Sequence, residues 1–212
     1  MKTDLLSDAV CIVAAAILLI MTAMSILEAE RASYEVNTGL FCAVMCLVPM
    51  IFRRLKIMSL PFALVIIIEI AIFLHAYGVL LMRYDDVKVW DTVTHSVSSV
   101  TVSLCSFYAL MSVSTFDPRI KISRRVMPIF VFMVAVAFGA YWESFEFAVD
   151  ELFGTNMQYS PWDTFRDLSC DIFGALVVSI YSYIYLGYKN EKDFVESLRI
   201  HPFLTRVAKS RG

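Results

Sequence analysis

The chain has 212 residues, of which 59% are hydrophobic and 18% charged, and its mean hydropathy is +0.69. These values exclude an ordinary soluble domain and predict a protein that lies in a lipid bilayer. The formal net charge is only −2 at pH 7, and nothing in the sequence indicates a nucleic-acid partner. The expected partners are membrane lipid and a lipid-linked or small-molecule substrate.

Six apolar segments predict an all-α, polytopic membrane protein, a bundle of about six transmembrane helices, because a spanning helix needs about 20 mostly apolar residues. The second segment is short and contains Pro49, so we expect it to tilt, to thin the bilayer, or to extend back into residues 34–37. Residues 1–190 would form one transmembrane domain and 191–212 a tail. The segments are 9–28, 38–53, 58–82, 87–113, 125–152 and 161–187.

The first segment, "AVCIVAAAILLIMTAMSIL", is preceded by one lysine and is too long for the apolar region of a secretory signal. It is therefore expected to stay as a span. All cysteines lie in apolar runs, where cysteine usually packs as a small hydrophobe. Two of them share a helix face, but without a third ligand they are a weak metal signal. The cysteines are Cys11, Cys42, Cys46, Cys105 and Cys170.

Basic residues predict the orientation of the segments. Lys and Arg gather at 53–56, at 119–125 and in the tail, and these regions alternate with loops that hold few of them. The positive-inside rule then places both termini in the cytoplasm of a multi-pass protein of the cell membrane. The tail itself is either an amphipathic segment on the anionic leaflet or a solvated chain.

The third and fourth segments carry polar side chains at membrane depth. His75 would lie about 10 Å from the outer end of its helix and Glu69 near the midplane. A single intramembrane histidine is often a hydrogen-bonding partner between helices, and for Glu69 a structural or proton-sharing role is the better interpretation. In the fourth segment, Asp91 and His95 are one turn apart on one side.

The fifth segment ends near Gly154, a residue suited to the left-handed position after a helix. Counting back from there, Asp150, Glu146 and Glu143 share a face at about 5, 11 and 15 Å from the outer end.

The sixth segment begins with a helix-start signal. Ser160 is the expected N-cap, Pro161 occupies the first helical position, and Asp163 stands three residues after the cap. Asp167 and Asp171 follow on the same face, roughly 9 and 15 Å further in.

These directions bring histidines and acids from four helices into one layer in the outer half of the bilayer. An ionised side chain at mid-bilayer costs at least about 2.5 to 3.5 kcal/mol, so the acids need bound cations, shared protons or water. Histidine with carboxylates suits zinc, manganese or iron, whereas carboxylates alone suit magnesium or calcium. The predicted cofactor is a divalent metal cation, with candidate ligands His75, His95, Glu143, Glu146, Asp167 and Asp171.

The loop "GTNMQYSPW" would lie directly above this layer. Its polar side chains could orient a substrate head group, or the loop could be an interfacial cap with an aromatic belt. The candidate substrate-binding residues are Asp91, Asp150, Asn156, Gln158 and Asp163.

The runs "WESFEF", "VDELFGTNMQ" and "DTFRDLSCDIFGAL", with the upstream "WDTVTH", resemble the YjdF-like inner-membrane family and, more loosely, the VanZ-like family. The resemblance covers roughly residues 75–178. It implies a small multi-pass membrane protein and no particular activity. The positions that match the motif are Glu143, Glu146, Asp150, Asn156, Gln158, Asp163, Asp167 and Asp171, and more loosely His75 and His95.

Three functions remain open. The first is a metal-dependent hydrolase or transferase that acts on a lipid or lipid-linked head group, with Glu143 and Asp167 as candidate catalytic carboxylates. The second is a cation- or proton-coupled transporter or channel, although the chain shows neither duplicated halves nor broken helices. The third is an accessory protein that uses the acids for packing. No nucleophile elbow, P-loop or dinucleotide fingerprint occurs.

Overall fold

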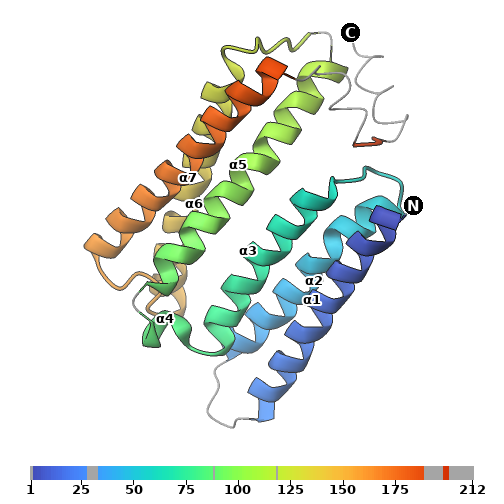
Figure 1. The fold of residues 1–212 in the computed structure, drawn as a ribbon. Helices are drawn as coiled ribbons and strands as arrows, with labels where there is room; N and C mark the ends of the chain where they lie inside the picture. Colours follow the sequence, from blue (N-terminus) through green and yellow to red (C-terminus); the bar gives the residue numbers. More distant parts are fainter. Residues whose placement is uncertain (1, 28–32, 88, 118, 189–197, 201–212) are drawn as a thin grey trace. The chain divides into compact units, whose positions relative to one another are not determined.

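The computed structural model describes residues 2–27, 33–87, 89–117, 119–188 and 198–200. These residues form helices and no strand, which confirms the predicted all-α class (Figure 1). The helices are α1 (Lys2–Leu27), α2 (Ser33–Arg54), α3 (Phe62–Leu80), α4 (Arg83–Asp86), α5 (Trp90–Phe116), α6 (Met127–Phe153) and α7 (Pro161–Tyr188).

Six of these helices are long and apolar enough to cross a membrane, so the prediction of six spans is confirmed. The second helix begins at Ser33 and keeps Pro49 inside it, so the segment does extend back past residue 34. Several helix boundaries differ from prediction: α1 already begins at Lys2, and α3 begins only at Phe62. The short α4, after the left-handed Met82, was not expected.

The described residues divide into two compact units, and the boundary between them lies within α5, between Thr94 and His95. We describe each unit by itself, and the single domain over residues 1–190 stays a prediction. The segment 198–200 belongs to the first unit, where the Ser59 N–H donates to the Leu198 carbonyl at 2.7 Å. The rest of the predicted amphipathic tail lies outside the described residues.

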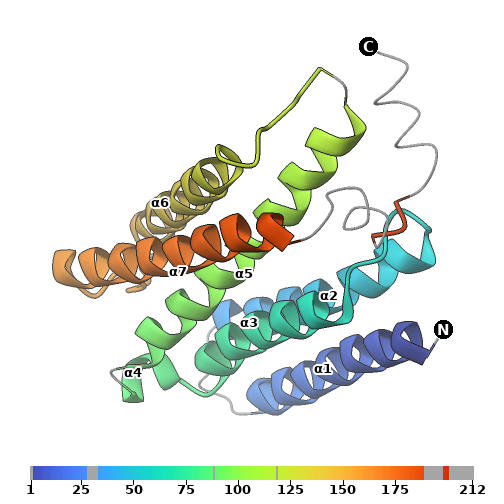
Figure 2. The same cartoon turned by 45° about the horizontal axis from the view of Figure 1, so that its top comes forward.

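In the first unit, α1, α2 and α3 pack side by side (Figures 1 and 2). Their core contains Leu18 and Ala76 together with two of the cysteines, Cys42 and Cys46, which are buried free thiols. Cysteine therefore packs as a small hydrophobe here, as expected. Glu69 of α3 is buried in the same unit, and its carboxylate faces the thiols of Cys46 and Cys11 without meeting hydrogen-bond geometry.

In the second unit, α6 and α7 lie side by side (Figures 1 and 2). A hydrogen bond joins α5 to α7. The Ser99 hydroxyl donates to the backbone carbonyl of Asp171 at 2.6 Å. Gly174 makes this approach possible, because a Cβ there would stand 2.8 Å from the Ser99 Oγ. Small residues bring helices close in this way in membranes.

The turn between α6 and α7 is the one that the sequence predicts. Gly154 adopts the left-handed conformation with φ 67°, and its N–H donates to the Asp150 carbonyl at 2.9 Å. At the start of α7, the Asp163 N–H donates to the Ser160 Oγ at 3.2 Å, while the Asp163 carboxylate accepts from the Tyr159 N–H at 3.3 Å. The predicted cap at Ser160 is confirmed, and both ends of the turn are fixed by local chemistry.

Candidate functional site

One imidazole and two carboxylates of the second unit meet where α5 begins and α6 ends. His95, Glu143 and Glu146 each offer one ligand atom, and these atoms lie within 4.8 Å of one another. The two glutamates share a face of α6 because they are three residues apart. Together with Asp167 and Asp171 of α7, we call these residues the α5–α7 cluster.

His95 and Asp171 are both more than nine-tenths buried, and their nearest atoms, His95 Nδ1 and Asp171 Oδ1, are 3.5 Å apart. This is an ion-pair distance and longer than a strong hydrogen bond. Gly139 makes room for the carboxylate, because a Cβ there would stand 2.5 Å from the Asp171 Oδ2. A carboxylate beside one ring nitrogen orients an imidazole so that its other nitrogen can bind a metal.

Glu143 is the least compensated carboxylate of the cluster. The residue is 5% exposed, and Gln158 Nε2 donates to its Oε2 at 3.1 Å and to its backbone carbonyl at 2.9 Å. The Thr164 hydroxyl lies near this carboxylate but outside hydrogen-bond geometry. Within the described part of the chain, Oε1 is buried and has no hydrogen-bond partner. Such an unsatisfied oxygen costs about 1 to 3 kcal/mol, and more when it carries charge.

Glu146 is half-buried and is held by its own helix. The Trp142 indole N–H donates to the Glu146 Oε1 at 2.8 Å, one turn earlier along α6. An indole N–H is a donor only, so the Glu146 oxygen is the acceptor in this contact.

Arg166 is the basic side chain that faces the acids of α7. It forms an ion pair with Asp163, and its Nε lies 3.5 Å from the Asp167 Oδ1. Its single charge is therefore shared between two carboxylates. Among the described residues, Glu143 accepts from the neutral amide of Gln158, and Asp171 lies against His95.

Asp150 holds the loop that follows α6. Its carboxylate accepts from the Thr155 hydroxyl at 2.6 Å, from the Met157 N–H at 2.7 Å and from the Gln158 N–H at 2.9 Å. The loop is thereby folded so that the Gln158 amide reaches Glu143. Asn156 is exposed in this loop. A role of these residues in substrate binding stays a prediction.

Two predicted site residues belong to the first unit. His75 Nδ1 lies 3.0 Å from the Tyr84 hydroxyl, which donates to the Thr94 Oγ1 at 3.3 Å. The Thr94 hydroxyl in turn donates to the backbone carbonyl of Asp91 at 2.8 Å, in the first turn of α5. His75 and Asp91 therefore belong to the first unit. That they lie in one layer with the acids of the second unit stays a prediction.

Sequence reasoning missed three residues that shape the cluster. Trp142 stands four residues before Glu146, and Gly139 four before Glu143, so helical spacing could have found both. Ser99 offered no such signal, because its contact with Asp171 joins positions 72 residues apart.

A family described as "Predicted membrane protein (DUF2238)" matches residues 9–188. The chain belongs to this family. DUF2238 membership agrees with the multi-pass architecture and with the YjdF-like resemblance, and the matched range contains the whole α5–α7 cluster. The description of DUF2238 names no activity, and the looser VanZ-like resemblance is not shown. Neither the curated proteins nor the solved structures contain a match to the chain.

Proposed function

We propose that the protein binds a divalent metal cation in the α5–α7 cluster. The observation that carries this proposal is Glu143 Oε1, a buried oxygen without a hydrogen-bond partner among the described residues. Ligand atoms of His95, Glu143 and Glu146 lie within 4.8 Å of one another. A cation among them would supply the missing partner and offset the excess of buried negative charge.

The ligand types indicate which metals fit. One imidazole with two carboxylates suits Zn²⁺, Mn²⁺ or Fe²⁺, whereas Mg²⁺ and Ca²⁺ favour oxygen ligands alone. Asp171 then acts as a positioning residue that orients His95 through Nδ1. Asp167 lies on the same face of α7 and remains a candidate general base.

The distribution of charge favours an enzyme over a transporter. Residues 127–142 of α6 and 172–188 of α7 contain no Asp, Glu, Lys or Arg. The acids therefore occupy one half of each helix. This favours a pocket closed at one end over a cation path, for which we would expect ionisable groups in both halves of the membrane. A lipid or lipid-linked head group is the substrate class whose chemistry lies at that depth. A metal ion there would activate a bound water.

Orientation belongs to this proposal, because the basic loops predict that the cluster opens outward. Ile122→Cys and Met157→Cys, each introduced into an otherwise cysteine-free chain, test it with a membrane-impermeant thiol reagent. We expect labelling of intact cells at residue 157 and none at 122. The reverse pattern would place the cluster on the cytoplasmic side.

Metal titration tests the proposal itself. Chelator-treated protein in detergent should gain thermal stability with Zn²⁺, Mn²⁺ or Fe²⁺ and less with Mg²⁺ or Ca²⁺. Because Asp171 acts through His95, Asp171→Asn should weaken the affinity about 10- to 100-fold and keep the fold. The proposal fails if no metal stabilises the wild-type protein, or if the variant binds metal as the wild type does.

A further inference from the structure

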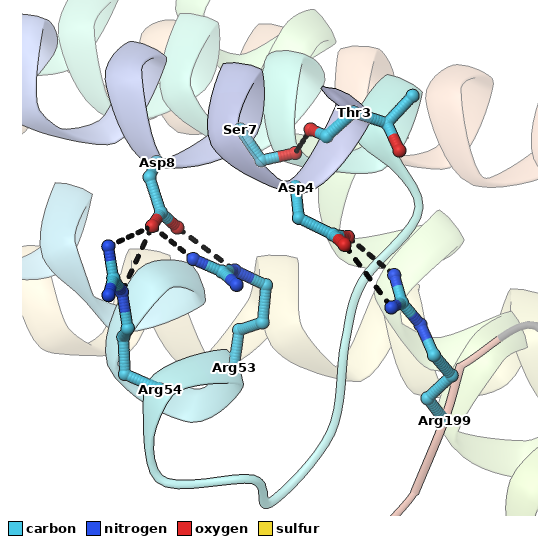
Figure 3. A network of polar contacts seen from close by, with 7 residues as sticks. All are labelled: Thr3, Asp4, Ser7, Asp8, Arg53, Arg54 and Arg199. Atoms are coloured by element: carbon cyan, nitrogen blue, oxygen red, sulfur yellow. Dashed lines mark hydrogen bonds and ion pairs between the residues drawn. The ribbon is translucent and has the colours of Figure 1, made fainter. Parts of the chain in front are cut away.

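A second polar site lies in the first unit, where α1 begins and α2 ends (Figure 3). The side chain of Asp8 is 3% exposed and lies against two arginines. Arg53 Nε donates to its Oδ1 at 2.9 Å, and Arg53 Nη2 pairs with its Oδ2. Arg54 Nε donates to the same Oδ2 at 3.0 Å, and Arg54 Nη2 forms an ion pair with it at 2.7 Å. One buried carboxylate therefore fixes two guanidinium groups.

A cavity of about 310 Å³ opens beside this network. Its negative charges are already matched: Asp8 neutralises one of its two arginines, and Asp4 is paired with Arg199, which is not part of the lining (Figure 3). The charge of one arginine and that of a lysine therefore remain, and the wall of the cavity is positive. The lining residues are Lys2, Asp4, Leu5, Asp8, Arg53 and Arg54.

The arginines keep unused donors. All their contacts with described residues go to Asp8 and use Nε and Nη2, so Nη1 of each guanidinium has no partner in this part of the chain. The side chain of Arg54 is 63% exposed and that of Arg53 23%. Because Asp8 fixes the orientation of each guanidinium group, the unused N–H groups are placed to donate to phosphate oxygens.

The place of the cavity indicates where the phosphate comes from. Arg54 is the last residue of a spanning helix and Lys2 the first of another, so the cavity lies at the depth of lipid head groups. Leu5 lines the cavity and is 70% exposed. A wall that combines cations with an exposed apolar side chain fits an amphiphile better than a free ion.

We propose that this cavity binds the phosphodiester head group of an anionic phospholipid. Arg53 and Arg54 donate to the phosphate oxygens, Lys2 adds a further positive charge, and Leu5 contacts the start of an acyl chain. Asp8 stays behind the arginines and fixes their orientation. This site is independent of the metal proposed for the α5–α7 cluster.

Lipid titration of the full chain in detergent tests the proposal. Phosphatidylglycerol should raise the Tm of the wild-type protein more than phosphatidylcholine does. Arg54→Gln should lose more than half of that rise, because it removes the more exposed guanidinium, and Arg54→Lys should recover part of it. The matched control is Arg125→Gln, which removes an exposed positive charge elsewhere and should respond as the wild type does.

Three outcomes would overturn the proposal. The first is an equal phosphatidylglycerol response in the wild type and Arg54→Gln, and the second is an equal response to the two lipids. The third is an equal rise with inorganic phosphate alone, which would assign the cavity to a soluble phosphate. If Arg54→Gln does not fold, the exposed Lys2→Gln replaces it, and the same comparison decides.

Discussion

Asp8 and Glu143 are both buried carboxylates on spanning helices, and the protein compensates them in opposite ways. Asp8 of the first unit has two arginines, so its surroundings carry excess positive charge. Glu143 of the second unit has the amide of Gln158 and lies among further acids, so its surroundings carry excess negative charge. Burying a charge in a membrane requires a partner. The first unit supplies that partner as two arginines, whereas the described contacts of Glu143 include no Lys or Arg side chain, and in our proposal a bound cation takes that place.

The largest effect is expected from Asp8→Asn. Removing one member of a buried ion pair costs about 3 to 5 kcal/mol, and we expect the lower end of that range because the arginines are partly exposed. Unfolding of the detergent-purified protein by a denaturing detergent measures the loss. Asp86→Asn is the control, because its ion pair with Arg83 is exposed and 3.9 Å long. Equal losses in the two variants would show that Asp8 is no more important than a surface acid.

An intermediate effect is expected from Gly139→Ala in the second unit. The added Cβ would stand 2.5 Å from the Asp171 Oδ2 and 3.0 Å from its Cβ and Cγ. Overpacking of this kind costs about 1 to 3 kcal/mol, and the displaced Asp171 should no longer orient His95. The Tm of thermal unfolding and the metal affinity should therefore both fall.

Gly187→Ala is the control for that change. Its Cβ would meet Nη2, the far end of the flexible Arg124 side chain, which can move away at little cost. If Gly139→Ala is as stable as this control and binds metal as tightly as the wild type, the position of Asp171 does not matter to the cluster.

The smallest effect is expected from Asp117→Asn, an ion pair outside the spans. Hydrogen bonds from Arg119 lower the pKa of Asp117 from 3.8 to about 2. A lowered pKa contributes stability that is present above pH 3.8 and is lost as the pH falls through about 2. Between pH 5 and 8 the Tm difference between the two proteins should therefore be small and constant. A difference that changes within this window would contradict the assignment.

Local pattern was enough to predict the spans and the turn between α6 and α7. Apolar run length located the six spans. Glycine and serine chemistry located the left-handed Gly154 and the cap at Ser160. Spacing of three or four residues put Glu143 and Glu146 on one face, where the structure finds them with His95.

Contacts between distant positions could not be predicted in the same way. Asp8 and Arg53 are 45 residues apart, and nothing near either one indicates the other. In the sequence, the arginines indicate only which side of the membrane their loop faces. Gln158 was assigned to the loop above the acids, but its donation to Glu143 depends on how Asp150 folds that loop.

The metal content of purified protein tests the central claim most directly, with Glu143→Gln beside the wild type. The substitution keeps shape and removes the charge of the proposed ligand. Glu151→Gln, at an exposed position of the same helix, is the control. We predict that wild type and control carry about one equivalent of Zn²⁺, Mn²⁺ or Fe²⁺ per chain and that Glu143→Gln carries none while still folded. Equal metal in Glu143→Gln and the wild type, or none in a metal-supplied wild type, would contradict the account.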